Sequence, residues 1–574
     1  MALLKAGYVI DEARRDELNA QGRNYWWVYI EEILNRLGLT AVRIHAADLA
    51  GRLSDLSLLF LGGTDARPFA SDLDLWARSG GVLIGCGIEG LDDLFGNEFV
   101  SHIPQPAGEF SIAGEMHLKD TDFTRGIHSP LYPESPLLIA SDVRLVDPVD
   151  SSTLAVAENH AAITARRHGS GWAFYLGFDL AQTFWVIQQG RPVDADYDGD
   201  GYLRTGDAIV IGDREPEIAY TDELLFLLQN MVSVHPIPLI HQIPPDGDTI
   251  PDFLLFYGGD DEGSVGIQVP AAEFMASRRL PYHINCMQLD CKFGVGEAEI
   301  ERMSALGTEL SPHYNFINGF KHPTGFTRAD VEKQTRAFVE HFGRLPVCSN
   351  FHWCRWTGWA EPALWLSEHG IRADNSYAHR QLTVLNPVNS MGFAFGTSYP
   401  FHFYADHRSG NRRLDVVELP IVAYEVGYTP DQTDFDILER AILLAAHYQS
   451  TMNFFYHPVY IANLGTCRSA IDRLLSLTKE SGISALHSAP DAVARWWENR
   501  SCTRIEDVRM NDNGLAFVAR TPSPSGFIAK IPLQSTEAPS TTLPHRVVEK
   551  FGHRWLLLAV PPGETAVELG VRPG

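Results

Sequence analysis

Residues 253–262, Phe-Leu-Leu-Phe-Tyr-Gly-Gly-Asp-Asp-Glu, constrain the fold of this chain more than any other stretch. The apolar run predicts a buried β-strand, and the two glycines and three acids that follow it predict the end of that strand. Ligands and catalytic groups collect at the carboxyl ends of strands in α/β sheets. Because neighbouring carboxylates repel, we expect a cation or a raised pKa at Asp260 or Asp261. A solvated acidic turn is the alternative reading of the same residues.

The composition describes an ordinary globular protein and excludes two classes of partner. The chain has 574 residues, of which 45% are hydrophobic and 21% charged, so it can hold several domains with full cores. A net charge of −26 repels nucleic acid and anionic membrane surfaces. No apolar run reaches the roughly 18 residues that span a bilayer. The composition is compatible with a carbohydrate ligand and leaves a homo-oligomer open.

Two further features predict the compartment. Residues 1–10 lack the apolar segment and cleavage site of a signal peptide. The seven cysteines are odd in number and scattered, which is typical of free thiols rather than a disulfide scaffold. Both observations predict the cytoplasm, and an exported form whose signal has been removed stays open.

Residues 1–234 alternate short apolar strands with amphipathic helices. Strands are expected near 6–10, 40–45, 56–61, 81–84 and 172–176, and helices near 26–37, 72–79 and 222–232. This alternation predicts a mostly parallel sheet covered by helices. The phrases at 58–63, 78–85 and 169–179 resemble the glutamine-amidotransferase-like, flavodoxin-like domains that are appended to some glycosidases and deacetylases.

Cys86 stands where an active amidotransferase carries its nucleophile, in a tight turn after a strand. A thiolate at a helix N-terminus there would be activated. The His-x-Glu partner near the end of such domains is missing, because residues 177–181 read Gly-Phe-Asp-Leu-Ala. We therefore expect Cys86 to be a small buried residue of a degenerate domain. A catalytic thiol is the alternative.

An acidic loop within this first domain has the spacing of a calcium site. Asp196, Asp198 and Asp200 take positions 1, 3 and 5, Gly201 takes position 6, and Asp207 takes position 12. The carbonyl of Tyr202 would supply the seventh-position ligand. Asp at position 12 reaches less far than the usual Glu. We predict an isolated calcium loop, with magnesium or a plain solvated loop as alternatives.

Changes of composition divide the remainder of the chain. Residues 235–252 are rich in proline and predict a stiff, extended linker. Residues 253–498 again alternate strand and helix. Residues 499–574 read as short alternating strands between clusters of Asn, Gly, Ser and Pro, which predicts a small antiparallel β domain.

Residues 253–498 resemble the polysaccharide deacetylases, carbohydrate esterases of the glycoside hydrolase/deacetylase superfamily. The likeness rests on phrases in a fixed order, which are Asp-Asp at 260–261, Gly-Thr-Glu-Leu-Ser-Pro-His at 307–313, Gly-Arg-Leu-Pro at 343–346, Leu-Ser-Glu-His-Gly-Ile-Arg-Ala-Asp-Asn-Ser at 366–376, Glu-Leu-Pro at 418–420 and Tyr-His-Pro at 456–458. The resemblance implies a distorted (β/α)₇ barrel with a metal site at the carboxyl ends of its strands.

The resemblance also implies roles for individual residues. Asp260 would be the general base that activates water, and His457 the general acid that protonates the leaving amine. Asp261 and His313 would bind a divalent metal, usually zinc. Together these groups would remove acetyl groups from an N-acetylated carbohydrate, with the metal acting as Lewis acid.

The chain departs from the family at one ligand. The family's second metal His lies four residues after the first, where this chain has Ile317. His352 is our candidate for the missing ligand, with His322 as a second, and a substrate contact or packed loop residue is the alternative for His352. Trp353, Arg355 and Trp356 are candidate sugar contacts or loop packing. With an eroded metal site the chain would instead be a non-catalytic glycan-binding or scaffold protein.

Overall fold

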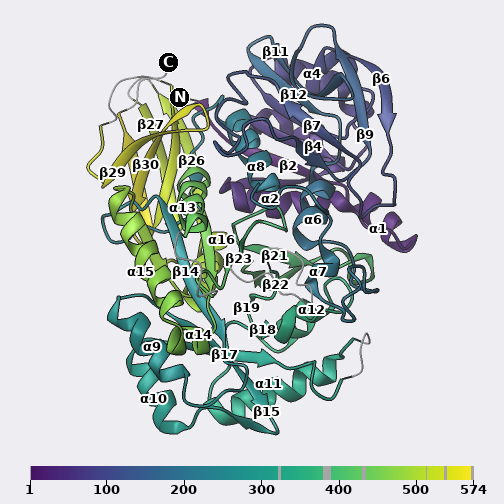
Figure 1. The fold of residues 1–574 in the computed structure, drawn as a ribbon. Coiled ribbons are helices and arrows are strands. Elements are labelled where there is room, and N and C mark those ends of the chain that lie inside the picture. The colour runs from purple at the N-terminus through teal and green to yellow at the C-terminus, as the bar shows by residue number, and fades with distance from the viewer. Residues whose placement is uncertain are drawn as a thin grey trace.

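The computed structural model describes residues 2–320, 325–378, 390–428, 435–511, 514–534 and 540–570. Figure 1 shows three regions: an N-terminal α/β region in purple and blue, a central region in teal and green at the opposite end, and yellow C-terminal strands beside the first. None of the helices among these residues is both long and apolar enough to cross a bilayer. The chain is thus a mixed α/β protein.

The N-terminal region is built on one sheet that is parallel on one side and antiparallel on the other. Its parallel part has the order β3-β2-β4-β5-β12, and β12 then pairs with antiparallel β11. The parallel part agrees with the expected alternation, whereas the antiparallel extension was not predicted. The elements are β2 (Ala6–Ile10), α1 (Glu12–Ala20), α2 (Ile30–Leu37), β3 (Ala41–His45), α3 (Leu49–Arg52), β4 (Leu58–Gly62), α4 (Ala70–Arg78), β5 (Val82–Cys86), α5 (Asp92–Phe95), β6 (Asn97–Ile103), β7 (Gly114–Leu118), β8 (Leu137–Ile139), β9 (Val143–Pro148), β10 (Ser152–Ala157), β11 (His160–His168), β12 (Gly171–Leu176), α6 (Leu180–Gln189), α7 (Thr205–Ala208) and α8 (Tyr220–Val232).

The central region opens with β14 (Phe253–Asp260), in which all eight residues are buried. This burial explains why the strand reads as a continuous apolar run rather than an alternating one. The elements that follow are α9 (Gln268–Ser277), β15 (His283–Leu289), β16 (Lys292–Phe293), α10 (Glu297–Ala305), β17 (Glu309–Tyr314), α11 (Arg328–Phe342), β18 (Asn350–Phe351), η5 (His352–Cys354), α12 (Glu361–Glu368), β19 (Ala373–Asp374), β20 (Ser390–Met391), β21 (Phe401–Tyr404), β22 (Arg413–Glu418), β23 (Ile421–Tyr424), α13 (Asp436–Tyr448), β24 (Thr451–Phe455), α14 (Pro458–Asn463), α15 (Gly465–Glu480), β25 (Ala485–Ser488) and α16 (Pro490–Cys502).

The central strands curve into a barrel-like sheet. β14 pairs in parallel with β15 on one side and with β24 on the other, and β15 leads through β17 to β18. The amide of Asn375 donates to the carbonyl of Ser349 at 3.0 Å and carries the curve to β19. β19 pairs with β22, and β23 returns to β24. Because these pairings are parallel, the carboxyl ends of the strands meet at one mouth.

Residues in the local sequence mark both ends of helix α11. The side chain of Thr327 and that of Asp330 form a capping box at its start, and Gly343 ends it with a left-handed φ of 67°. A glycine is favoured there because it has no Cβ to oppose a positive φ. The sequence between these two signals is therefore sufficient to define this helix.

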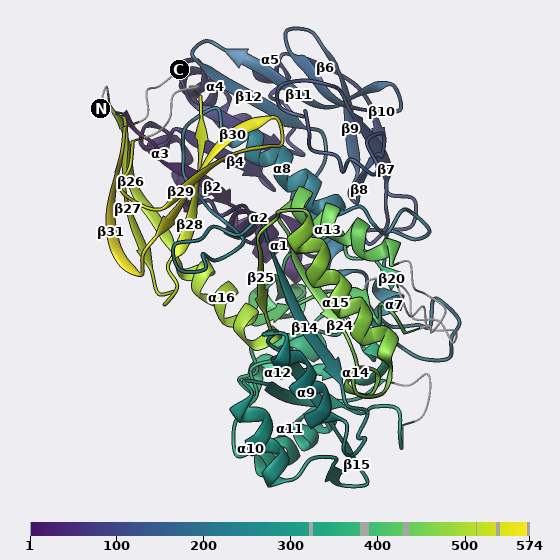
Figure 2. The same cartoon turned by 60° about the vertical axis from the view of Figure 1, so that its left-hand side comes forward.

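The last strands form two antiparallel sheets, and each recruits a strand from elsewhere in the chain. β1 (Ala2–Leu3) pairs with β26 in one sheet, and β13 (Leu239–Ile240), from the proline-rich segment, pairs with β28 in the other. Figure 2 shows both sheets in yellow beside the N-terminal region. Their remaining strands are β26 (Arg504–Asn511), β27 (Gly514–Thr521), β28 (Phe527–Leu533), β29 (His545–Lys550), β30 (His553–Val560) and β31 (Gly563–Leu569).

A buried polar contact ties the N-terminal region to the central one. Arg36 of α2 donates to Asp222 of α8 at 2.7 Å, and both side chains are fully buried. The backbone amide of Ser398, in the central region, donates to the same carboxylate at 2.9 Å. Because an unpaired charge would be costly there, removing any one partner would weaken the junction of the two regions.

Lys530 of β28 gives a testable pH dependence of stability. Its side chain is 2% exposed, and burial lowers its pKa to about 7. The amine is therefore neutral in the folded protein at alkaline pH, whereas in the unfolded chain it stays protonated up to about pH 10. The unfolded state then binds more protons, and the free energy of unfolding rises with pH between these values, by up to about 1.4 kcal/mol per pH unit. We expect Lys530→Met to stabilise the protein most near pH 7, with a gain that shrinks toward pH 9 in urea denaturation. Lys119→Met, at an exposed site, is the control: its effect on the free energy of unfolding should be the same at pH 7 and pH 9.

Candidate functional site

Four of the predicted residues meet at the mouth of the barrel-like sheet. Asp260 ends β14, His313 lies in β17, His352 follows β18 and His457 follows β24. Nε2 of His313 lies 3.5 Å from Oδ2 of Asp260, and Nε2 of His457 lies 4.0 Å from the same atom. All four side chains are nearly buried. The order of the strands in the sheet brings these residues together from segments far apart in the sequence.

Glu262 stands at the centre of this cluster, although the sequence analysis gave it no role. Its carboxylate lies 2.7 Å from Nε2 of His352, 3.2 Å from Nε2 of His457 and 3.6 Å from Nε2 of His313. The backbone of Glu262 has a φ of 53°, an uncommon conformation for a residue with a side chain. The available signal in the sequence was a third acid directly after the Asp-Asp pair.

Asp261, predicted as a metal ligand, does not lie in the cluster. Oδ1 accepts hydrogen bonds from the amides of Met287 and Gly263, both at 2.8 Å, and Oδ2 accepts one from the side chain of Gln268 at 3.1 Å. Burial raises the pKa of Asp261 to about 6 although these donors oppose the shift. Both oxygens are thus occupied by hydrogen bonds to β15, α9 and the turn after β14, and Glu262 rather than Asp261 faces the histidines.

The electrostatics of the cluster are dominated by paired opposite charges. Burial would raise the pKa of Glu262, but the neighbouring imidazoles of His313, His352 and His457 hold it well below its usual range. Burial would likewise lower the pKa of His313, but the charges of Asp260 and Glu262 raise it. The charges of Glu262 and His313 therefore stabilise each other.

Glu425 orients His457 and was not found from the sequence. It follows β23, is fully buried, and its Oε1 is paired with Nδ1 of His457 and accepts the His457 amide at 2.8 Å. Burial opposes protonation of His457, but Glu425 outweighs it and raises the pKa of His457 well above its usual value. A carboxylate on one ring nitrogen fixes the tautomer and directs Nε2 into the cluster. The available signal was an acid directly after the apolar run at 421–424.

Gly259 explains how His457 comes so close to Asp260. A Cβ at this position would clash with the carbonyl oxygen of Tyr456. Only a residue without a side chain lets the end of β24 pack against β14 here. The second glycine of the opening motif is therefore required by the site.

A chain of buried polar side chains fixes the orientation of Asp260. The side-chain amide of Asn285 donates to Oδ1 of Asp260 at 2.8 Å. Nε2 of His283 lies 3.0 Å from Oδ1 of Asn285, and its Nδ1 faces Glu309 at 3.2 Å and Asp491 at 3.5 Å. This chain of contacts leaves Oδ2 of Asp260 as the oxygen that faces the histidines.

Three residues of the cluster fit a divalent transition metal. Glu262, His313 and His352 each offer one ligand atom, and these atoms lie within 4.8 Å of one another. Both ring nitrogens of His313 are buried without a hydrogen-bond partner among the described residues, which is costly unless a further group binds there. Two imidazoles and a carboxylate are a donor set that zinc accepts. His322, the second candidate ligand, lies outside the described residues.

The three candidate substrate residues have different environments. Trp353 is 46% exposed, has a φ of 55°, and its ring centroid lies 5.8 Å from that of His352. Arg355 and Trp356 are fully buried. Burial, with Arg204 nearby, lowers the pKa of Arg355 to about 10. Trp353 is therefore exposed at the mouth, whereas the burial of Arg355 and Trp356 favours the loop-packing alternative for these two residues.

The acidic loop of the N-terminal region packs against this mouth. The ring of Tyr202 contacts Trp353 at 5.3 Å, and the amide of Trp356 donates to the carbonyl of Leu203 at 3.1 Å. Val193 and Gly358 exchange backbone hydrogen bonds of 2.8 and 3.0 Å. A segment that the sequence analysis assigned to another domain thus supports the loop that carries Trp353.

Within the acidic loop, three of the four predicted carboxylates lie together. Ligand atoms of Asp196, Asp198 and Asp207 lie within 4.8 Å of one another. Burial and the neighbouring carboxylates raise the pKa of Asp198 to about 6. Asp200 instead pairs with the guanidinium of Arg204. The loop therefore offers fewer free carboxylates than its spacing predicts.

Cys86 has the environment of a buried structural thiol. It ends β5, is 1% exposed, and burial together with the charge of Asp179 raises its pKa well above the usual value. An activated nucleophile needs the opposite shift. The structure favours the small buried residue over the catalytic thiol.

Comparisons with known proteins give distant structural neighbours only. No family model and no curated protein sequence matches the chain. A protein from Parabacteroides distasonis, described as a candidate glycoside hydrolase/deacetylase, is 11% identical, covers 49% of this chain and 81% of that one, and has a TM-score of 0.31. A β-galactosidase from Bacillus circulans sp. alkalophilus is 14% identical over 31% of this chain and 30% of that chain, with a TM-score of 0.24. This chain therefore spans under a third of that enzyme.

The contrast between Glu262 and Asp261 is testable by metal analysis. We expect purified protein to contain a divalent transition metal, Glu262→Gln to lose most of it, and Asp261→Asn to keep it. The second variant should instead lower stability by about 1–3 kcal/mol, because it disturbs buried hydrogen bonds. Inductively coupled plasma mass spectrometry and urea denaturation measure the two effects. Metal loss in Asp261→Asn with retention in Glu262→Gln would reverse the assignment.

Proposed function

We propose that this protein is a metal-dependent hydrolase that removes acyl groups from the nitrogen of an N-acylated carbohydrate. The catalytic region would be a distorted (β/α)₇ barrel of the polysaccharide deacetylase type. The observation that carries the proposal is the arrangement of Asp260 and His457, which approach each other beside a carboxylate and two histidines suited to a metal. An acid, a base and a metal site in one mouth are what amide hydrolysis needs.

In this proposal Asp260 is the general base and His457 is the general acid. Oδ2 of Asp260 takes a proton from the attacking water while Asn285 holds Oδ1. Nε2 of His457 gives a proton to the leaving amine nitrogen, and Glu425 keeps the ring oriented through Nδ1. Glu262, His313 and His352 would hold the metal, most simply zinc. When bound, it would polarise the acyl carbonyl and lower the pKa of water.

Trp353 supports a sugar as the substrate. Aromatic rings bind the apolar faces of sugars, and this exposed ring lies beside the candidate metal ligand His352. Tyr202 and Arg204, from the acidic loop, pack against Trp353 at 5.3 and 5.6 Å. We propose that the N-terminal region thereby shapes the substrate entrance.

A calcium ion in the loop 196–207 stays a proposal of its own. Asp196, Asp198 and Asp207 support it by their proximity, and the ion would stiffen the segment that backs Trp353. The pairing of Asp200 with Arg204 reduces the number of available ligands. This proposal concerns a different group of ligands from the candidate metal site at the barrel mouth, so either one can hold without the other.

The first activity prediction concerns the acid and the base. We expect release of acetate from N-acetylated oligosaccharides, with kcat reduced about 10²- to 10⁴-fold in Asp260→Asn and in His457→Gln. Asp290→Asn, an exposed acid beyond β15, serves as the matched control and should keep its activity. Acetate release is measured by an enzyme-coupled assay.

Three observations would contradict this proposal or separate it from the glycan-binding alternative. Acetate release that persists in both variants would exclude the assigned acid and base. Glycan binding without hydrolysis by metal-loaded protein would favour the non-catalytic reading. Metal content measured in the same variants shows whether a loss of activity is simply a loss of metal.

The second activity prediction concerns the sugar platform. We expect Trp353→Ala to raise KM by about tenfold, the equivalent of a stacking contact of about 1.4 kcal/mol, with a smaller change in kcat. Trp353→Phe should restore most of the affinity because it keeps an aromatic face. Steady-state kinetics on oligosaccharides of increasing length measure both. An unchanged KM in Trp353→Ala would remove this residue from the substrate site.

A further inference from the structure

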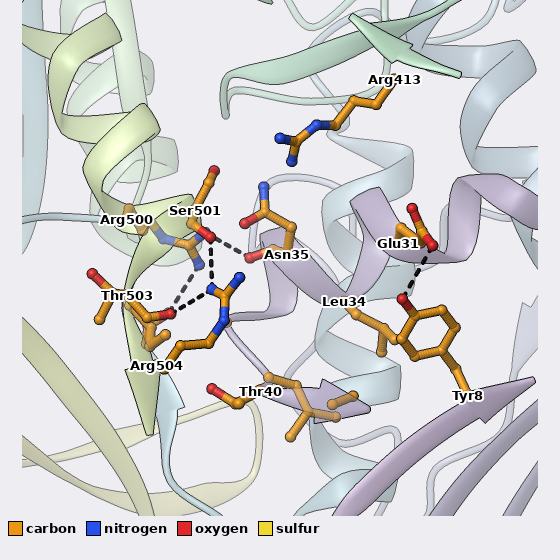
Figure 3. Close-up of a pocket in the computed structure, with 14 residues that line it drawn as sticks. Tyr8, Glu31, Leu34, Asn35, Thr40, Arg413, Arg500, Ser501, Thr503 and Arg504 are labelled. Carbon is orange, nitrogen blue, oxygen red and sulfur yellow. Dashed lines mark hydrogen bonds between the residues drawn. The ribbon is translucent and has the colours of Figure 1, made fainter. Parts of the chain in front are cut away.

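A cavity of about 200 Å³ lies where the three regions meet, away from the barrel mouth. Its lining comes from β2 and α2 of the N-terminal region, from β22 of the central region, and from the end of α16 with the start of β26. Figure 3 shows Arg413 extending into it from one side, with Arg500 and Arg504 on another and Tyr8 with Glu31 on a third. The cavity is thus lined mainly by polar and charged side chains.

Arg500 brings a buried charge to the wall of this cavity. It is 1% exposed and donates to the carbonyls of His241, Asn35, Arg36 and Ile240 at 2.9, 2.6, 3.0 and 2.9 Å. Among the described residues no carboxylate accepts a hydrogen bond from it or lies within 4.0 Å of it. Carbonyl dipoles satisfy its N–H groups, and the charge of the buried Glu32 offsets part of the cost of burying it.

The other two arginines also lack an acidic partner. Nη1 of Arg504 donates to the carbonyls of Ser501 and Thr503, both at 2.7 Å, which leaves its remaining N–H groups to face the cavity or solvent. Arg413 forms no hydrogen bond or ion pair with the described part of the chain, and Figure 3 draws it without one. Arg413 and Arg504 are exposed to solvent, and together with Arg500 they give this cavity a local excess of positive charge in a protein of net charge −26.

The single acid of the lining does not neutralise these arginines. Glu31 accepts a hydrogen bond from the hydroxyl of Tyr8 at 3.1 Å and lies 3.5 Å from Arg43, which is outside the cavity lining. Its charge therefore already has a cationic partner. The lining retains an excess of positive charge that a ligand could compensate.

We propose that this cavity binds a small oxyanion, the phosphate or carboxylate group of a molecule no larger than a monosaccharide. Guanidinium forks match the planar or tetrahedral oxygens of such groups, and the volume of about 200 Å³ admits one sugar ring with its charged substituent. Because the lining comes from all three regions, binding would join them and stabilise the folded chain. Inorganic phosphate, a hexose phosphate and a uronic acid share this chemistry.

The test uses the full chain at constant ionic strength. Isothermal titration calorimetry and thermal unfolding are run with inorganic phosphate, glucose 6-phosphate, glucuronate and, as the neutral control, glucose. We expect saturable binding and a rise in Tm with at least one anion and none with glucose. The double variant Arg413→Gln/Arg504→Gln should lose both effects, whereas Arg408→Gln, an exposed arginine of the same region, should keep them.

A second measurement makes the outcome independent of how the variants fold. Phenylglyoxal modifies accessible arginines, and mass spectrometry maps the rate at each site of the native protein. A saturating anion should slow modification of Arg413 and Arg504 about fivefold or more, with no change at Arg408. A preference for phosphate or for glucuronate identifies the charged group. If none of the three anions binds saturably or protects these arginines, the proposal is overturned.

Discussion

The site depends on one electrostatic constraint, the crowding of carboxylates at the end of β14. Asp260 and Glu262 lie at the same mouth and would repel each other in a buried setting. The Nε2 atoms of His313, His352 and His457 surround them at distances between 2.7 and 4.0 Å from their carboxylate oxygens. This arrangement requires four strands, β14, β17, β18 and β24, to place their carboxyl ends at one point, so the site depends on the order of the strands in the sheet.

The three regions of the chain are joined by buried polar groups as well as by apolar packing. Arg36 and Asp222 meet the backbone of Ser398 across one junction, and Arg500 binds the terminal carbonyls of α2 across another. The segments β1 and β13 complete the two C-terminal sheets. Because such contacts are costly to break one at a time, the regions hold fixed positions, and the acidic loop can support the barrel mouth.

Much of the fold and part of the site could be predicted from local sequence. The apolar run of β14, the capping box of α11 and the strand before His457 are encoded by neighbouring residues, and the structure has each of them. The order of motifs, and not any single one, placed Asp260, His313, His352 and His457 in one site. The antiparallel half of the N-terminal sheet, which includes the nine-residue β11, was missed because its pairing joins segments that no local pattern relates.

The sequence by itself determined which residue types are present at the ends of the strands, whereas the tertiary structure decided which of them face one another. Asp261 and Glu262 differ by one position, and hydrogen bonds from Met287, Gly263 and Gln268 hold Asp261 away from the histidines. Glu425 reaches His457 through a parallel pairing between β23 and β24 that no local pattern specifies. The burial of Trp356 and the exposure of Trp353 likewise follow from segments packed against them. The burial and the mutual orientation of these side chains depend on contacts between segments far apart in the sequence. For that reason they could not be predicted from local sequence patterns.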